Sequence, residues 1–555
     1  MITAGICTPI ARLSATRLVS IALIVVGAIS TGSARAQGAP QGTTASNDES
    51  SPLEEVIVTG TRRDDRSVTD SASPIDIISG ADINAQPTAN MLDTVRNLVP
   101  SFYVGQNAIS DASTFVRAPS LRGLPSDQVL VLLNGKRYNR SALVQVYNGG
   151  DTGLSFGSHG SDLASIPSIA IKKLEVLRDG ATSQYGSDAI AGVLNYGLRD
   201  DVGFEVVARY GQFQEDSDGE SQQIAANLGF ELGDRGFVNF SAEYVDEGET
   251  SRGVTRPVAV SFAEENPELA DQLPHYPLPA QIWGNSPMHG YKLLLNSSLG
   301  VTEDSNVYLF ANYADRKADQ SFNFRSSLLG TREYVDEAGV THVIGGRSFF
   351  QQPYYQTQCP AGNATCPEGG YVLDDNIFEL STIYPGGFTP RFVGETEQIY
   401  GTIGYKRDAD SGLRYDFSVS GSRNTLALSM YNSISPSFGA ESQTSFEFGD
   451  LIQEEFVANI DLAYGIDAGL ASPLTLSGGI EYREETYEAT EGDPQSYGVG
   501  PYGTAHPLFE ETRRVRASIP IPDCSRLWNR RRQAATAERP RRMRAAPARI
   551  AMAPT

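Results

Sequence analysis

The chain has 555 residues, a net charge of -23 and a mean hydropathy of -0.26, which is the composition of a folded protein. No apolar stretch reaches the roughly 18 to 20 residues of a membrane-spanning helix, so a helical membrane protein is excluded. The acidic body argues against nucleic acid as a partner, because nucleic acid requires a basic face. Glycine (54), tyrosine (25) and phenylalanine (23) are plentiful, which suits many strands and turns in a soluble β protein or a membrane β-barrel.

Residues 1–36 have the pattern of an export signal. Two arginines precede an apolar run at 18–29, and Ala34-Arg35-Ala36 supplies a small-residue cleavage site. The run is too short for a membrane anchor. We expect cleavage after residue 36, followed by a flexible polar linker at 37–53.

Residues 54–63 hold a short strand-forming segment in polar surroundings. Val56-Ile57-Val58 is a run of three β-branched residues. The segment could be the first strand of the next domain. Alternatively, it could add itself to the sheet edge of a partner protein. In that case the pairing residues are Glu55, Val56, Ile57, Val58 and Thr59.

Residues 64–200 have a mixed α/β pattern. We expect strands at 74–78, 129–133 and 169–177, and an amphipathic helix at 88–99. These elements predict a small compact domain. Turns are expected at Asn134-Gly135 and at Arg178-Asp179-Gly180.

After residue 201 the hydrophobicity alternates with a period of two. In the segment 237–245, the apolar face carries Val238, Phe240, Ala242 and Tyr244, and the polar face carries Asn239, Ser241 and Glu243. Strands of this length can cross a bilayer when tilted. The other expected strands lie at 203–213, 222–232, 289–300, 306–317, 397–407, 413–421, 453–464 and 474–483.

The connections between these strands alternate in length. Short turns at 233–236, 301–305 and 408–412 contrast with long polar connections, which lie at 247–288, 319–396 and 428–450. Short turns at one end and long loops at the other are typical of an outer-membrane barrel. A soluble β-sandwich needs no such alternation. The pattern therefore favours antiparallel transmembrane strands.

The sequence contains none of the spacings that mark common catalytic sites. Its five histidines form no zinc-binding pair, and no nucleophile elbow, phosphate loop or dinucleotide fingerprint occurs. We therefore expect neither an enzyme nor a metal or cofactor site. Cys359 and Cys366 lie in one polar stretch of an exported chain, which predicts a small disulfide; a metal site would need a second pair of ligands.

Three motifs resemble those of one family. Residues 55–60 resemble the TonB box of TonB-dependent outer-membrane receptors. The stretch 120–137 is similar to the middle of the family's plug domain, and the run 166–195 is highly specific to it. The motif residues of the plug are Arg122, Gly123, Asn134, Gly135, Arg178, Asp179, Gly180, Tyr185, Gly186, Asp188 and Gly192.

The resemblance implies a mainly β fold, with an N-terminal α/β plug domain at 64–200 inside an antiparallel transmembrane β-barrel of about 22 strands. It implies active uptake of a siderophore, vitamin or oligosaccharide across the cell outer membrane. The small-molecule substrate would bind at the extracellular face, and residues 55–59 would pair with TonB of the energy-transducing inner-membrane complex. The partners implied are TonB, outer-membrane lipid and that substrate, with no nucleic acid.

Two features depart from the family pattern. Residues 201–512 supply only about nine or ten strands, and residues 513–555 form a basic tail with 12 arginines against two acids. The tail lacks the family's terminal aromatic strand. An aberrant or frame-shifted end explains it better than a polybasic binding segment. We therefore expect a partial β-barrel and a receptor that is incomplete as written. The rival hypotheses are a truncated product that does not transport, an interaction protein or, less favoured, a passive porin.

Overall fold

The computed structural model describes most of the chain between residues 75 and 498, together with 549–552. The expected signal peptide, the linker, the TonB box at 54–63, and Cys359 and Cys366 lie outside the described residues. Within the described range the gaps are 87, 89, 106–107, 118, 146–156, 179–184, 187, 327–331, 336–340, 345–355, 359–370, 374–382, 410, 436–437, 439–440 and 470–473.

The N-terminal part is a small α/β domain around a five-stranded sheet of order β1-β6-β7-β4-β5. Strands β4 and β7 run parallel, and the other neighbours are antiparallel. The domain's apolar core lies on this sheet and includes the fully buried Leu133, Leu174 and Tyr196. The strands are β1 (Ile75–Ser79), β4 (Val129–Leu133), β5 (Lys136–Arg137), β6 (Ile171–Leu177) and β7 (Gly192–Leu198), with the separate pair β2 (Phe102–Val104) and β3 (Pro119–Leu121).

Side-chain caps fix where the helices of this domain begin. Ser79 and Asp82 form a capping box at α2 (Gly80–Asn84), and the Asn90 side chain accepts a hydrogen bond from Leu92 N at 3.0 Å. Helix α3 therefore runs over Met91–Leu98, three residues later than expected. The 3₁₀ helices are η2 (Ala112–Thr114), η3 (Ser126–Gln128), η4 (Leu163–Ser165) and η5 (Ser168–Ala170).

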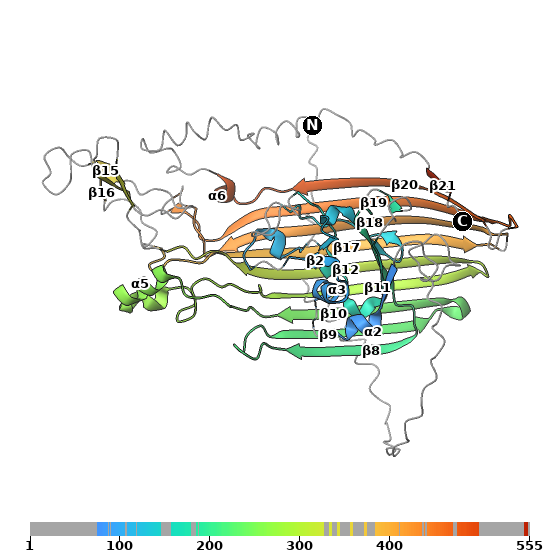
Figure 1. Ribbon diagram of the computed structural model, residues 1–555, viewed down its shortest axis with the longest axis horizontal. Coiled ribbons are helices and arrows are strands. Elements are labelled where there is room, and N and C mark those ends of the chain that lie inside the picture. Colours follow the sequence, from blue (N-terminus) through green and yellow to red (C-terminus); the bar gives the residue numbers. More distant parts are fainter. Residues whose placement is uncertain are drawn as a thin grey trace, which may run out of the picture. The chain divides into compact units, whose positions relative to one another are not determined.

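The rest of the described chain is built on a ten-stranded sheet of order β21-β20-β19-β18-β17-β12-β11-β10-β9-β8, antiparallel throughout (Figure 1). Nine of its strands lie between residues 203 and 489, in agreement with the expected number, and they are mostly longer than the alternation predicted. Their bounds are β8 (Gly203–Gly211), β9 (Ser221–Glu231), β10 (Gly236–Glu247), β11 (Met288–Thr302), β12 (Ser305–Ser321), β17 (Arg391–Asp408), β18 (Leu413–Tyr431), β19 (Phe446–Ile466), β20 (Leu474–Ala489) and β21 (Arg549–Met552).

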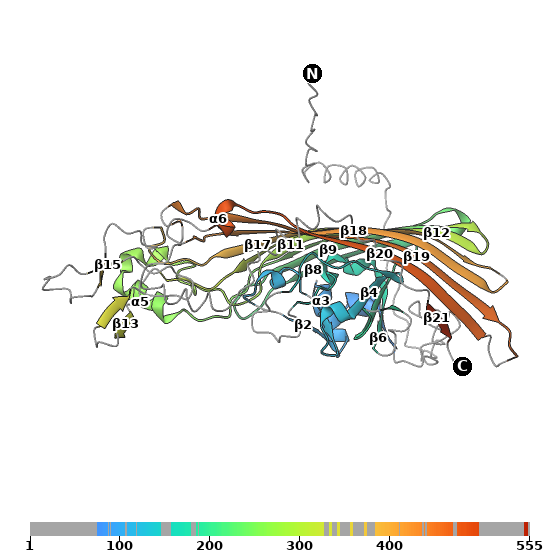
Figure 2. The same cartoon turned by 90° about the horizontal axis from the view of Figure 1, so that it is seen from above.

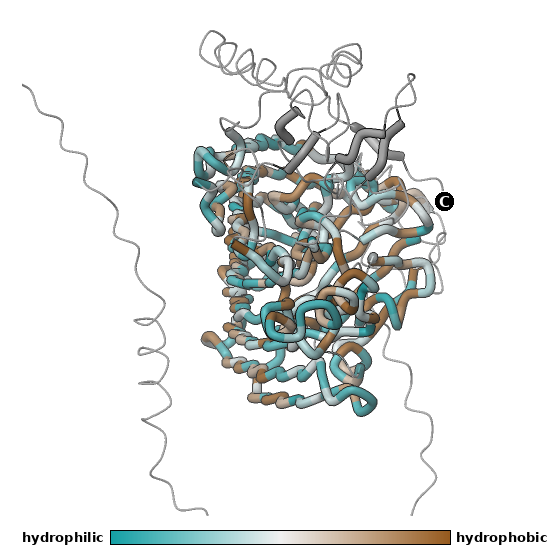
Figure 3. Tube along the Cα trace, turned by 90° about the vertical axis from the view of Figure 1, so that its left-hand side faces the viewer, coloured by the Kyte–Doolittle hydropathy of each residue, from teal (hydrophilic) through white to brown (hydrophobic). Residues whose placement is uncertain are grey.

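This sheet buries its polar face and exposes its apolar face, which is the reverse of the arrangement in a water-soluble sheet. On β10 the polar Asn239, Ser241 and Glu243 are buried, whereas Phe240 and Tyr244 on the opposite face are exposed. On β18, likewise, Ser418, Ser420 and Asn424 are buried, whereas Phe417 and Val419 are exposed. Figure 3 shows the hydropathy alternating along the tubes. A soluble protein would bury its apolar face instead. An exposed apolar face on alternating strands is the pattern of a transmembrane barrel wall.

The connections differ in length at the two ends of the sheet (Figure 1). At one end, η6 (Gly233–Arg235), the two residues 303–304 and the turn 409–412 join neighbouring strands. At the other end, the connection 248–287 carries α5 (Pro257–Glu265) and η7 (Pro267–Gln272). The connection after β18 is shorter than expected, because the strands continue to Tyr431 and resume at Phe446. Further elements at this end are β13 (Arg332–Val335), β14 (Thr341–Ile344), β15 (Gln356–Gln358), β16 (Tyr371–Leu373) and α6 (Pro494–Tyr497).

The sheet is open in the described part of the chain, where no ladder joins β8 to β21. Figure 2 shows the α/β domain on one side of the curved sheet. This is the side of the buried polar residues, because these residues hydrogen-bond to the α/β domain. Among the described helices, none is long and apolar enough to cross a membrane.

Candidate functional site: the interface between the plug and the barrel wall

We call the N-terminal α/β domain the plug and the ten-stranded sheet the wall. A tight hairpin of the plug makes the first set of contacts between the two. Asn134 and Gly135 have φ values of 49° and 78°, so they form a two-residue turn of the I′ type between β4 and β5. The Asn134 side chain accepts from Leu198 N at 2.8 Å and donates to the wall residue Asn296 at 3.2 Å. The turn is therefore fixed to β7 and to the wall together.

The hairpin presents cations to the last strands of the wall. Lys136 Nζ lies 3.1 Å from Asp416 on β18 and 3.7 Å from Asp461 on β19. Arg137 Nε lies 3.9 Å from Glu481 on β20. The chain thus places positive charge on the plug opposite negative charge on the wall.

Asp188 is the centre of the densest ion cluster at this interface. Its Oδ2 lies 2.5 Å from Arg137 and 3.3 Å from Arg140, both of the plug, and 3.2 Å from Arg483 on β20. Arg483 also binds Glu485 at 2.5 Å. Burial would raise the pKa of Asp188, but the three arginines outweigh it and hold this pKa below its usual range. Asp188 is therefore an ionised link between plug and wall.

His159 lies beside this cluster. One of its ring nitrogens is 2.6 Å from the carbonyl oxygen of Ser141, and its ring meets Tyr487 of β20 edge-on at 6.0 Å. Burial lowers the pKa of His159. Together with Arg137, Asp188, Glu455 and Arg483, His159 lines a small polar cavity between the plug and the wall.

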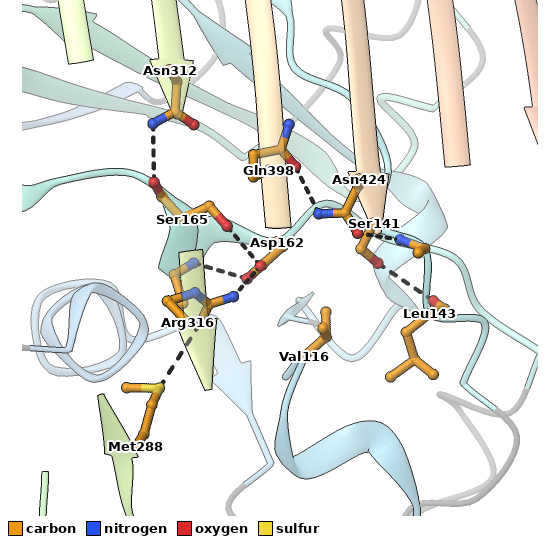
Figure 4. Close-up of polar contacts among 12 residues, drawn as sticks. Val116, Ser141, Leu143, Asp162, Ser165, Met288, Asn312, Arg316, Gln398 and Asn424 are labelled. Atoms are coloured by element: carbon orange, nitrogen blue, oxygen red, sulfur yellow. Dashed lines mark hydrogen bonds and ion pairs between the residues drawn. The ribbon is translucent and has the colours of Figure 1, made fainter. Parts of the chain in front are cut away.

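A second set of contacts joins the plug to β10, β11 and β12 through deeply buried charges. Glu243 of β10 accepts from Ser168 N at 2.7 Å and from Ser168 Oγ at 2.8 Å, and it pairs with Lys292 of β11 at 2.6 Å. Arg316 of β12 pairs with Asp162 of the plug (Figure 4). All four charged side chains are 5% exposed or less. Buried charges of this kind are stable only when they are paired with opposite charges.

Amide side chains of the wall bind the plug between these two sets of charges. Asn312 donates to the carbonyl oxygen of Ser165 at 3.1 Å and accepts from Tyr138 Oη at 2.7 Å. Asn424 accepts from Ala142 N at 2.5 Å and donates to Gln398 at 2.8 Å (Figure 4). The wall therefore meets the plug through neutral polar groups as well as ions.

The other motif residues in the described part of the chain make the contacts given below within the plug. Arg122 and Gly123 form a second turn with φ values of 55° and 75°, and Arg122 donates to the carbonyl oxygen of Arg178. Arg178 pairs with Asp76 inside the plug, not with the wall. Asp179 and Gly180 lie outside the described residues. Tyr185 packs on a small apolar cluster of the plug, and Gly186 has a φ of 94°.

Gly192 stands where two strands approach closely. Its φ is 152°, and a Cβ there would lie 2.3 Å from the carbonyl oxygen of Leu177 and 2.7 Å from a methyl group of Leu121. No larger residue fits this position without moving the backbone. The glycine therefore allows β7 to pair with β6.

Several interface residues carried no signal in the sequence. Arg140 of the plug meets Glu485 of β20 only after folding, because the two lie far apart in the chain. The same is true of Arg483 of β20 and Asp188 of the plug. Glu243 was recognised as a polar-face residue but not as a partner of Ser168. The sequence offered one indication of the interface, which was the pair of cations, Lys136 and Arg137, directly after the turn at Asn134-Gly135. Among the described residues, no three histidines, cysteines or carboxylates gather as a group that could hold a metal ion.

Comparison with known proteins identifies the plug. Residues 67–193 match the family model described as TonB-dependent Receptor Plug Domain. Over 196 residues the chain is 29% identical to the vitamin B12 transporter BtuB of Vibrio cholerae serotype O1 (strain M66-2), which covers 34% of this chain and 28% of that protein. The matched region thus spans a little over a quarter of that relative's length.

Solved structures with a similar arrangement include two receptors. The siderophore receptor PirA from Acinetobacter baumannii has a TM-score of 0.45 and 15% identity, with 76% of this chain and 49% of that chain covered. A mutant of the ferric enterobactin receptor PfeA from Pseudomonas aeruginosa, in complex with enterobactin, has the same TM-score and identity, with 75% and 50% covered. The chain spans about half the length of these structures.

Proposed function

We propose that this chain, which belongs to the TonB-dependent receptors, serves the active uptake of a scarce nutrient across the outer membrane. One observation carries the proposal. A plug domain of this family lies against the polar face of an antiparallel sheet whose opposite face is apolar and exposed. A plug bound to the inner face of a barrel wall blocks free diffusion, so passage requires work on the plug.

The outward face of the sheet supports a location in a lipid bilayer. Side chains such as Phe204, Phe240 and Ile403 are exposed by 43% or more. In water this surface would be a large apolar patch, which soluble monomers avoid. In lipid it stabilises the fold. The export signal expected at residues 1–36 is consistent with an outer-membrane protein.

The source of energy follows from the location. The outer membrane carries no energy supply of its own, so a plugged receptor depends on a protein that reaches it from the inner membrane. Residues 55–59 can pair as a strand with TonB, because Val56-Ile57-Val58 has high β-propensity and backbone hydrogen bonds suffice for such pairing. A passive porin would need neither this segment nor a plug.

The substrate belongs to the classes of siderophore, vitamin or oligosaccharide. The matched relative from Vibrio cholerae is named for vitamin B12, which makes a vitamin the first candidate to test.

Uptake measurements in the host that carries the gene test this function. The gene is deleted and restored, in strains with and without TonB, and cells are given labelled cyanocobalamin, ferric enterobactin and maltooligosaccharides in turn. We expect one class to accumulate only when both the gene and TonB are present. Uptake that needs the gene but not TonB would indicate a passive pore. Equal uptake by all strains would support the rival hypothesis of a product that does not transport.

A further inference from the structure

The connection between β10 and β11, residues 248–287, folds into a neck and a head. In the neck the two arms of the connection pair with each other. Thr250 N donates to the carbonyl oxygen of Asn285 at 3.2 Å, and Arg252 N donates to that of Trp283 at 2.9 Å. The head, residues 256–281, carries α5 and η7 and buries apolar side chains of its own, including Phe262. A long connection that packs on its own side chains is a folded element.

The connection between β12 and β17 is held together where it leaves the wall. Its residues 322–326 and 383–390 belong to the described part of the chain, and we call these two stretches the base. Arg325 and Phe388 exchange both of their backbone hydrogen bonds, each at 2.8 Å. Phe322 N donates to the carbonyl oxygen of Pro390 at 2.9 Å. The base is therefore a short paired extension of β12 and β17.

The head and the base share one apolar core and several hydrogen bonds. Phe324 of the base is buried in the same cluster as the apolar side chains of the head. The buried side chain of Gln281 accepts from Phe324 N at 3.2 Å and from Arg256 at 2.5 Å. Thr389 of the base donates to the carbonyl oxygen of Ala280 at 2.6 Å. Unfolding of either part would expose apolar area of the other, so each stabilises its partner.

Gly386 shows how closely the base approaches the head. A Cβ at this position would lie 2.5 Å from the carbonyl carbon and oxygen of Gln272 and 2.7 Å from Leu273 N. All three atoms belong to the backbone, so they cannot turn aside as the end of a flexible side chain can. Backbones in such close contact leave little room for one part to shift without the other.

One arginine fastens both connections to the wall. Arg391, the buried first residue of β17, directly follows the base. It binds Glu249 of the neck at 2.6 Å and Asp319 of β12 at 2.8 Å. Asp319 also accepts from Tyr431 Oη at the end of β18 at 2.6 Å. The neck of the first connection and the base of the second are therefore held at the same point.

From these contacts we infer that the head and the base are one cooperative unit, which opens and closes as a single body. Segments that are distant in the chain unfold together when they share a core and its hydrogen bonds. The unit is a conformational device at the end of the sheet where the long connections gather. Any molecule that displaces the head will displace the base as well. This inference goes beyond the proposed uptake function and does not depend on it.

Hydrogen exchange of the full chain, measured by mass spectrometry in membrane vesicles, tests the coupling from the side of the base. Gly386→Ala changes the base, and the readout is the exchange of amides in the head, such as Asn266 N, which donates to the carbonyl oxygen of Phe262. We expect these amides to exchange about tenfold faster, because the new methyl group forces the head away. The control is Gly211→Ala at the end of β8, where nothing lies within 4 Å of the added Cβ.

The reciprocal variant changes the head and reads the base. Phe262→Ala removes a buried ring from the head, and we expect the Phe388 amide of the base to exchange about tenfold faster. If Phe262→Ala does not fold, Gln281→Met replaces it, because that variant keeps the length of the side chain and loses only its polar end. Faster exchange in both parts, from either side, would support the inference. Exchange that changes only in the altered part, or equally in Gly211→Ala, would overturn it.

Discussion

Asp188 of the plug and Arg483 of strand β20 are 295 residues apart in the chain, yet their side chains lie 3.2 Å apart. Arg137 and Arg140 complete the shell around the same carboxylate. A single acid thus joins the hairpin of the plug to the wall. Such a charged contact joins two parts of the protein that lie far apart in the chain.

The Asp188–Arg483 pair should contribute measurably to the attachment of the plug. We expect a double-mutant cycle of Asp188→Asn and Arg483→Gln to give a coupling free energy of about 1 to 2 kcal/mol. The coupling free energy is obtained from the rates at which the plug is proteolysed in urea, in outer-membrane fragments. The matched control is the exposed pair Lys317–Glu395, 2.6 Å apart, for which we expect less than about 0.5 kcal/mol. Equal coupling in both pairs would contradict the assigned role.

Attachment of the plug should weaken as the pH falls through the range of histidine. Burial lowers the pKa of His159 in the folded protein, so the unfolded state takes up its proton first. The stabilisation from the neutral ring is complete above the ordinary pKa of about 6.5 and is lost as the pH falls through the folded-state pKa. Proteolysis of the plug between pH 7.5 and 5.5 should show the trend. In the variant His159→Gln, the rate of proteolysis should change less with pH. An unchanged pH dependence in this variant would exclude His159 as the cause of the effect.

Gly192→Ala should destabilise the plug by about 2 to 4 kcal/mol, because the new methyl group would overlap the carbonyl oxygen of Leu177. Gly203→Ala is the control. Its φ of 146° is close to the 152° of Gly192, but nothing lies within 4 Å of the added Cβ. The free energy of unfolding of each variant, measured by urea titration, separates the clash from backbone strain. Similar losses in the two variants would show that the φ value alone matters.

Phe240→Arg should impair folding in the membrane by about 2 to 4 kcal/mol, because it places a charge on the lipid-facing side of β10. Phe240→Leu keeps that face apolar and should have little effect. The share of each variant recovered in the outer-membrane fraction is the measurement. If the arginine variant were recovered like the leucine variant, the exposed apolar face would not be facing lipid.

The sequence carries the local pattern of this fold but not its long-range contacts. Alternation of side chains in β10 separates Phe240 from Ser241, and the turn at Asn134-Gly135 follows from residues that tolerate positive φ. Which face of β10 is buried depends on the plug, and residues close in sequence do not determine it. The parallel pairing of β4 with β7 was likewise not expected, because it joins segments more than 50 residues apart.

The candidate site also combines residues that the sequence marks with partners that only the fold brings to them. Asp188 stood in a motif, but its partners Arg140 and Arg483 could not be chosen among the chain's many arginines without the fold. Arg178, in the same motif, binds Asp76 within the plug. Charge alone does not tell whether a motif residue stabilises a domain or joins two domains.

The central claim, that the receptor is driven by TonB, is tested most directly by cross-linking at the TonB box. Ile57→Cys in the full receptor, expressed in cells with a cysteine-bearing TonB, should form a disulfide-linked complex with TonB. Val56→Pro removes a backbone donor and fixes φ, so adding it should abolish the complex. A complex that forms equally with and without the proline would show that residues 55–59 do not pair as a strand, and no complex at all would contradict the claim.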